Sequence, residues 1–140
     1  MLDHDTYARL CRARDFLAAH YARRLTLDKA AEVACLSPFH FHRLFSSAFG
    51  ETPLHFQTRL RIREAKHRLI LDNDPVTDIC FDLGYESLGS FSSRFRRLVG
   101  HSPLHFRRNI RRRFFVPALW RLQTLPYCFV QFYGLEKPQD

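Results

Sequence analysis

Apolar residues at helical spacing mark the segment between residues 37 and 50. Ser37 followed by Pro38 is a strong helix start signal, because the serine can cap the first turn and proline fits its first position. Gly50 is a typical residue at the end of a helix. At a period of about 3.6 residues, one apolar stripe of this helix is formed by Phe41, Leu44, Phe45 and Ala48.

The same supersecondary unit occurs twice in the chain. At an offset of 50 residues, the pairs that coincide between residues 37–56 and 87–106 are Ser37/Ser87, Phe41/Phe91, Phe45/Phe95, Gly50/Gly100, Pro53/Pro103, Leu54/Leu104, His55/His105 and Phe56/Phe106. Upstream, at an offset of 49, the matching pairs are Leu27/Val76, Ala31/Cys80 and Leu36/Tyr85. The slip of one residue falls between the two helices of each unit, where a turn can absorb it. Each unit is therefore predicted to be a helix, a short turn and a helix.

An all-α fold of about seven helices follows from these signals. The expected elements are an N-terminal helix over about 6–23, helix-turn-helix units over about 26–49 and 76–99, a long linker helix over about 53–72 and a last helix over about 103–112. Thr26 is the expected cap of the first unit. The N-terminal helix is expected to pack on that unit through Tyr7, Leu10, Cys11, Ala13, Phe16, Leu17 and Tyr21. Residues 114–140 form an apolar tail of unknown role.

The charge of the chain favours a polyanionic partner. The net charge is +8 and the isoelectric point is about 9.9. No acidic residue lies between Glu86 and Glu136, where the chain carries Arg94, Arg96, Arg97, Arg107, Arg108, Arg111, Arg112, Arg113 and Arg121. The planar guanidinium group matches phosphates and guanine edges better than the lysine ammonium does.

Several classes of protein are disfavoured by the composition. Cys11, Cys35, Cys80 and Cys128 are scattered without a CxxC pair, so we expect no metal, no cofactor and no disulfide framework. The N-terminus lacks the apolar core of a signal peptide, and no run approaches the roughly 20 apolar residues of a membrane span. A cytoplasmic protein without a membrane partner is expected. Since no catalytic triad, phosphate loop or paired carboxylates are evident, it is not expected to be an enzyme.

Residues 84–107, GYESLGSFSSRFRRLVGHSPLHFR, resemble the second signature motif of the AraC/XylS family of transcription regulators. The motif has a Gly-aromatic pair, Phe-Ser, Phe, Gly, Ser-Pro and aromatic-Arg at matching spacing. The resemblance covers residues 6–113 and implies that residues 1–113 are one all-helical domain binding double-stranded DNA. It also implies that the third and sixth helices enter adjacent major grooves. The expected linker, about 30 Å long, is close to the roughly 34 Å repeat of the groove.

The outward face of the first recognition helix contains the candidate base-reading residues Phe39, His42, Arg43, Ser46 and Ser47. The resemblance matches base-contacting positions to Phe39, His42 and Arg43. Arg43 is suited to a guanine edge, Phe39 to a thymine methyl group and His42 to a purine N7 or a phosphate. The alternative for Phe39 is cover by a neighbouring segment. A metal site at His40 and His42 is not expected, because side chains two residues apart on a helix diverge.

The second recognition helix is expected to bury Phe91, Phe95 and Leu98. Its candidate base-reading residues are Gly89, Ser92, Ser93 and Arg96. Many family members have arginine where this chain has Ser93, so the first unit is predicted to supply more of the specificity. The candidate phosphate contacts are Ser37, Arg97, Arg107, Arg108 and Arg111.

The family habit favours an activator over a repressor, with RNA polymerase as a possible partner. Binding as a monomer to an asymmetric site is expected, with a dimer through the tail as the alternative. Two competing classes are a DNA-alkylation repair enzyme, for which the dispersed cysteines supply no metal-held cluster, and a protein-binding module that lacks DNA affinity. The operator, the target genes and the controlling signal do not follow from the sequence.

Overall fold

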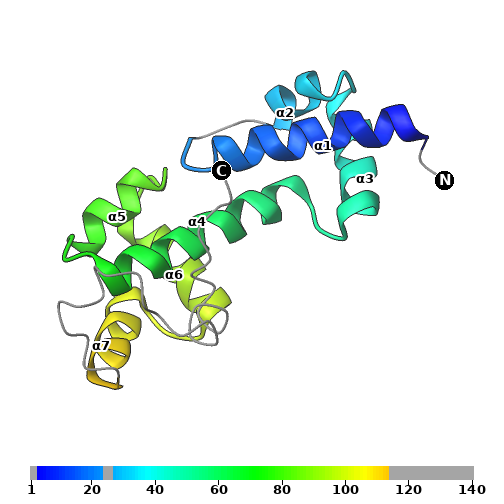
Figure 1. Cartoon of the computed structure of the whole chain (residues 1–140). Helices are drawn as coiled ribbons and strands as arrows, with labels where there is room; N and C mark the ends of the chain where they lie inside the picture. Colours follow the sequence, from blue (N-terminus) through cyan, green and yellow to red (C-terminus); the bar gives the residue numbers. More distant parts are fainter. Residues whose placement is uncertain (1–2, 24–26, 114–140) are drawn as a thin grey trace. The chain divides into compact units, whose positions relative to one another are not determined.

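The computed structural model describes residues 3–23 and 27–113, and within these ranges every regular element is a helix (Figure 1). The helices are α1 (His4–Ala19), α2 (Leu27–Val33), α3 (Pro38–Phe49), α4 (Pro53–Leu71), α5 (Val76–Asp82), α6 (Leu88–Val99) and α7 (Pro103–Arg113). The predicted all-α fold is therefore confirmed. The expected cap Thr26 and the tail at 114–140 lie outside the described residues. None of the helices described is both long and apolar enough to cross a membrane.

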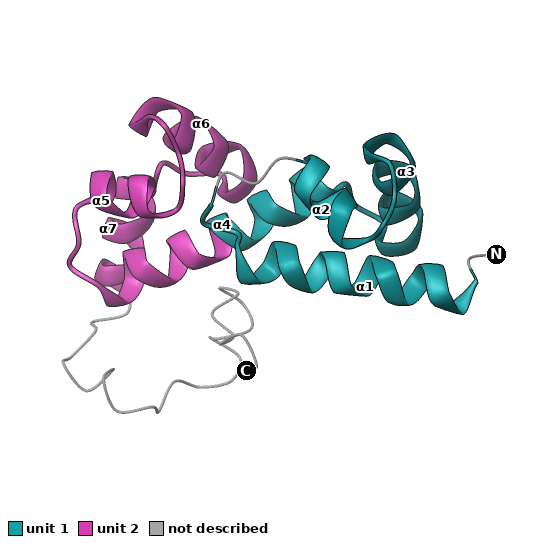
Figure 2. Ribbon diagram, turned by 90° about the horizontal axis from the view of Figure 1, so that it is seen from above, with its two compact units in different colours: residues 1–61 teal, residues 62–140 magenta. Residues whose placement is uncertain are grey.

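The chain divides into two compact units, residues 1–61 and 62–140 (Figure 2). The division falls inside α4, between Arg61 and Ile62. The first unit contains α1, α2, α3 and the beginning of α4, and the second contains the rest of α4 with α5, α6 and α7. Each helix-turn-helix motif is thus preceded and followed by a helix of its own unit.

The caps of α3 and α6 form as the sequence predicts. The hydroxyl oxygens of Ser37 and Ser87 accept from backbone N–H groups three residues ahead, at 3.4 and 3.1 Å. Gly50 and Gly100 end the two helices in the left-handed conformation, with φ of 72° and 90°. These caps set the direction in which the second helix of each unit leaves its turn.

The N-terminal helix begins earlier and ends earlier than predicted. Asp3 is its N-cap, and its carboxylate accepts from the backbone N–H and the hydroxyl group of Thr6, both at 2.8 Å. The hydrogen bond from the Thr6 N–H lowers the pKa of this carboxyl group. The helix ends at Ala19, where the His20 N–H donates to the Phe16 carbonyl.

The turn between the two helices of each unit needs one residue at positive φ. In the second unit this residue is Gly84, with φ of 81°, and 49 positions earlier it is Cys35, with φ of 53°. The backbone hydrogen bonds match: Leu36 N–H to Ala31 carbonyl at 3.0 Å, and Tyr85 N–H to Cys80 carbonyl at 3.2 Å. A side chain in this conformation costs roughly 1–2 kcal/mol, which glycine avoids.

We therefore expect Cys35→Gly to raise the free energy of unfolding by up to about 1 kcal/mol, after allowance for the greater freedom of glycine in the unfolded chain. Gly84→Ala, the reciprocal change, should lower it by about 1–2 kcal/mol. Cys35→Ala is the control, because it keeps the Cβ atom and removes only the exposed thiol. Urea denaturation measures all three, and equal stability of the glycine and alanine variants at position 35 would contradict strain at this turn.

The core of the first unit forms between α1, α2, α3 and Phe56 of α4. Leu10, Ala13 and Leu17 are buried as predicted, whereas Tyr7 is 45% exposed. Tyr7 still packs beside the edge of the core, since the centroid of its ring lies 6.1 Å from that of the Phe49 ring. The outermost turn of α1 therefore covers the end of α3 without being enclosed itself.

The core of the second unit repeats this arrangement with Phe91, Phe95 and Phe106, whose rings lie within 6 Å of their neighbours. One prediction is wrong here: Leu98 is 42% exposed, although helical spacing places it near the buried stripe. It lies on the wall of a groove instead of facing the phenylalanine core. A period alone cannot tell the core from a groove beside it.

Candidate nucleic-acid interface

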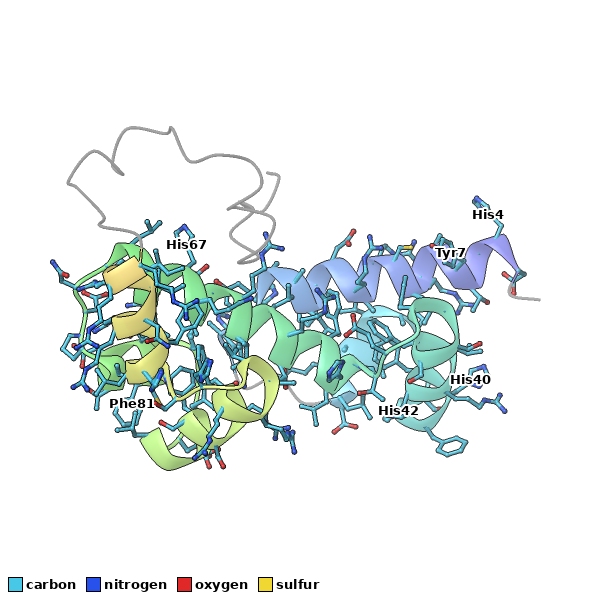
Figure 3. All side chains as sticks on the ribbon, turned by 90° about the horizontal axis from the view of Figure 1, so that it is seen from below. His4, Tyr7, His40, His42, His67 and Phe81 are labelled. Carbon is cyan, nitrogen blue, oxygen red and sulfur yellow. The ribbon has the colours of Figure 1, made fainter. Side chains whose placement is uncertain are left out.

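Helix α3 presents an outward face that agrees with the predicted one. Phe39, His42, Arg43 and Ser47 are exposed, and Phe39 is 80% exposed, so no described segment covers it. Figure 3 shows the side chains of His40 and His42 on this helix. Ser46 is half-buried, and its hydroxyl donates to the His42 carbonyl at 2.8 Å. Its hydroxyl is thus engaged with the helix backbone.

Arg43 is the main charged group of this face. One of its terminal nitrogens, Nη2, lies 3.2 Å from Nδ1 of His40, one turn earlier on the helix. Within the described residues, no carboxylate pairs with Arg43. Its guanidinium group keeps most of its donors available to a partner. The neighbouring apolar ring of Phe39 adds a large uncharged surface beside this cation.

Helix α6 presents a flatter face with shorter side chains. Gly89, Ser93, Arg96 and Arg97 are exposed, and Ser92 is half-buried. A Cβ atom placed on Gly89 would meet nothing within 4 Å, so the described structure does not require a glycine there. The longest donors on this face, Arg96 and Arg97, lie in the last turns of the helix.

The predicted phosphate contacts fall into two groups. Ser37, Arg97 and Arg108 are exposed, and the Ser37 hydroxyl caps α3. Arg107 and Arg111 are half-buried and donate to backbone carbonyls of their own unit. The sequence did not predict this second role.

Arg107 and Arg111 hold the carboxyl-terminal end of α4. Arg107 donates to the carbonyls of Leu69 at 3.3 Å and Asp74 at 2.6 Å, and Arg111 donates to that of Asp72 at 2.8 Å. Burial, followed by the nearby charge of Arg111, lowers the pKa of Arg107. Charged donors are well suited to the last carbonyls of a helix, which have no partners within it.

The first unit has equivalent hydrogen bonds to the carbonyls just after the end of α1. Fifty positions before Arg107 and Arg111 stand Gln57 and Arg61. Gln57 donates to the Arg23 carbonyl at 3.2 Å, and Arg61 donates to the carbonyls of Tyr21 at 2.6 Å and Arg23 at 2.8 Å. The sequence held a signal for this role, because Arg61 and Arg111 are a repeat pair. In the sequence, arginines that contact DNA phosphates cannot be told from arginines that donate to the carbonyls at a helix end.

The two units differ in charge at the helix that follows each recognition helix. In the first, Glu51 bonds to Arg59 at 2.7 Å and to His55 at 3.0 Å, and the bond from Arg59 lowers the pKa of the Glu51 carboxyl. In the second, His101 takes the place of Glu51 and its ring stacks on His105, 4.9 Å away. The second unit therefore lacks this carboxylate.

No group of three metal-ligating side chains occurs among the residues that the structure describes. Cys80 is buried, its thiol donates to the Ser87 carbonyl at 3.4 Å, and burial raises the pKa of the thiol. This cysteine is therefore a packing residue that is poorly ionised at neutral pH. Cys128 lies outside the described residues.

The chain is similar to proteins with helix-turn-helix domains. Residues 30–109 match the family model of a helix-turn-helix domain. The chain is 35% identical over 105 residues to the HTH-type transcriptional activator RhaS of Escherichia fergusonii, covering 75% of this chain and 38% of RhaS. It is 29% identical over 93 residues to the bifunctional transcriptional activator/DNA repair enzyme AdaA of Bacillus subtilis, covering 66% of this chain and 44% of AdaA.

Solved structures share the fold. The DNA-binding domain of AdpA, determined in complex with a target DNA, has a TM-score of 0.72 at 25% identity, covering 76% of this chain and 96% of that one. The C-terminal domain of AraT, a response regulator from Geobacillus stearothermophilus, has a TM-score of 0.68 at 30% identity, covering 71% and 84%.

Two helix-turn-helix units in tandem, each with an outward recognition helix, define the class: a DNA-binding domain of transcription regulators. More closely, the chain belongs to the AraC-type helix-turn-helix family. The chain spans less than half the length of RhaS and AdaA, 38% and 44% respectively.

Proposed function

We propose that the chain regulates transcription by binding a specific site on double-stranded DNA, with α3 and α6 in adjacent segments of the major groove. The observation that carries this proposal is the duplication of the recognition helix. Both helices have a serine cap, a buried pair of phenylalanines and an outward face with arginine. Helix α4 is continuous over 19 residues and contributes to both units.

In the first unit we assign base reading to Phe39, His42 and Arg43. Arg43 would donate to the O6 and N7 atoms of a guanine, and Phe39 would pack on a thymine methyl group. Their exposure supports these roles. We also assign Ser47 and Ser46 to base reading. The Ser46 hydroxyl donates to the His42 carbonyl, so it would contact a base as an acceptor.

In the second unit we assign base reading to Ser92, Ser93 and Arg96, and close approach of the DNA to Gly89. Because the serine side chains are short, they reach fewer base edges than arginine does. The first unit then supplies more of the specificity, and the second holds the backbone more firmly.

For phosphate contacts we retain Ser37, Arg97 and Arg108, and we assign Arg107 and Arg111 to holding the end of α4. The paired variants Arg108→Ala and Arg111→Ala separate these roles, since the two arginines lie one turn apart on the same helix.

Arg108→Ala is expected to weaken binding by a similar factor on all duplexes and to reduce the slope of log affinity against log salt by about 0.9, as for one lost phosphate contact. The free energy of unfolding of the Arg108→Ala protein should change by less than about 0.5 kcal/mol. Arg111→Ala should lower the free energy of unfolding by about 1–2 kcal/mol, because the Asp72 carbonyl loses a charged donor. Salt titrations of binding and urea denaturation measure the two effects. An Arg111→Ala protein with unchanged stability and a reduced salt slope would contradict the assignment.

Activation of transcription is favoured over repression, because RhaS and AdaA are both named as activators. We propose RNA polymerase as the second partner and a monomer on an asymmetric site as the bound form. Catalysis is not part of the proposal, although AdaA is named as a DNA repair enzyme as well as an activator. Transcription in vitro from a template carrying the selected site tests the sign of regulation, and a decrease with added protein would contradict activation.

A further inference from the structure

The Arg43 side chain has one polar partner among the described residues, and that partner is His40. The Nη2 atom of Arg43 and the Nδ1 atom of His40 lie 3.2 Å apart. The two residues are three positions apart on α3, where side chains are neighbours on one face of a helix. Arg43 is exposed, whereas His40 is half-buried and its backbone N–H donates to the hydroxyl group of the Ser37 cap. The histidine is therefore the better fixed member of the pair.

The chemistry of this contact defines the state of the His40 ring. A guanidinium group carries N–H donors and no acceptor, so Nδ1 of His40 accepts the hydrogen bond from Arg43. The ring is then neutral and carries its proton on Nε2. The contact occupies one N–H of the guanidinium group and leaves the remaining donors to a base edge. It thus holds the arginine without removing its capacity to bind guanine.

The second unit lacks both members of this pair. Fifty positions after His40 and Arg43 stand Ser90 and Ser93. The capping serine and the buried phenylalanines of α3 recur in α6, so this helix forms without a histidine at the equivalent position. The histidine is present in the unit that has an arginine three positions later, and absent from the unit that does not. A role in holding the arginine accounts for this difference, whereas a role in forming the helix does not.

Holding Arg43 before the DNA arrives favours base reading. Arginine has several rotatable bonds, and ordering them on binding costs free energy. A bidentate contact to the O6 and N7 atoms of guanine also requires a defined orientation of the guanidinium plane. A neighbour that already holds Nη2 lowers the cost of ordering and restricts the orientation.

We propose that His40 is a positioning residue for base reading, whose Nδ1 atom holds the Arg43 guanidinium group in the orientation that meets a guanine edge. His40 contacts no base itself and acts through Arg43 alone. The inference rests on the proposed function, because it requires Arg43 to read a base. It adds a determinant of specificity that lies outside the predicted base-reading residues.

A double-mutant cycle on the discrimination at one base pair tests this role. The pair is the one at which Arg43→Ala loses its preference, and the discrimination is the ratio of the dissociation constants for the changed and the preferred duplex. His40→Leu should lower this ratio by about 2- to 12-fold, the equivalent of about 0.5–1.5 kcal/mol for one side chain that is ordered on binding. In the Arg43→Ala background, His40→Leu should change neither the ratio nor the affinity for the preferred duplex.

His40→Asn is the matched variant for His40→Leu. The amide oxygen of asparagine stands where Nδ1 stands on the histidine side chain, so it can accept the same hydrogen bond. His40→Asn should therefore restore most of the discrimination that His40→Leu loses. Far-UV circular dichroism of all variants establishes that the helices are retained.

Each way in which the test can fail has its own signature. An unchanged ratio in His40→Leu, or an equal loss in His40→Asn, overturns the positioning role and leaves base reading by Arg43 intact. A loss of affinity that persists in the Arg43→Ala background assigns His40 to a DNA contact of its own and also overturns it. A wild-type chain whose preferences all survive Arg43→Ala overturns the base-reading role of Arg43 together with this inference. A wild-type chain without any preference overturns the proposed function as well.

Discussion

Replacement of Arg43 by alanine is expected to weaken binding to the preferred duplex by about 5- to 150-fold, the equivalent of about 1–3 kcal/mol for a guanine contact. The loss should be confined to one base pair: when that pair is changed, the variant and the wild type should bind almost equally. The physical reason is the exposed guanidinium group on α3, which no described carboxylate neutralises. Binding to a panel of single-substitution duplexes measures both quantities.

Arg12→Ala is the control for Arg43→Ala. Arg12 is an exposed arginine of α1, outside both recognition helices, and its loss removes the same net charge. It should weaken binding only slightly. If Arg43→Ala weakens all duplexes by the same factor, the side chain contacts phosphate and the base-reading role is wrong. Ser93→Ala extends the test, since it should relax specificity less than Arg43→Ala does.

Replacement of Phe95 by alanine should lower the free energy of unfolding by about 3–5 kcal/mol, the range for a fully buried phenylalanine. Its side chain has no exposed surface and lies 5.8 Å from the ring of Phe91 and 5.5 Å from that of Phe106. Removing the ring leaves a cavity at the point where α6 and α7 meet. A loss of this size is a large fraction of the stability of an ordinary small domain.

Phe81→Ala is the control for the core, because Phe81 is 56% exposed on α5 of the same unit (Figure 3). It should change stability by less than about 1 kcal/mol. Urea denaturation followed by circular dichroism measures both variants. Similar losses for the two would contradict the description of the core of the second unit.

The boundaries of the recognition helices could be predicted because their signals are local. A serine cap and a glycine in the left-handed conformation act on the turns next to them, so Ser87 and Gly100 define α6 from the sequence alone. The repeat added independent support, since each signal recurs 50 positions away. The start of α1 was missed by a few residues because Asp3 and Thr6 are both suitable caps.

The features that could not be predicted depend on contacts between distant segments. Arg111 lies on a helical face full of arginines, and only the fold brings it to the Asp72 carbonyl, 39 residues away. Leu98 has the spacing of a core residue, but the wall of a groove has the same period. The outward face of α3 could be predicted, because exposure there is the complement of the buried stripe of Phe41 and Phe45.

Selection of preferred sites from a random duplex library, at near-physiological salt, tests the central claim most directly. If α3 and α6 both read bases, the selected motif should contain two half-sites whose centres are about one helical turn, or 10–10.5 base pairs, apart. The half-site that loses its preference in Arg43→Ala should be the one with the stronger sequence requirement. Tight binding without any sequence preference, or a single undivided half-site, would contradict the account.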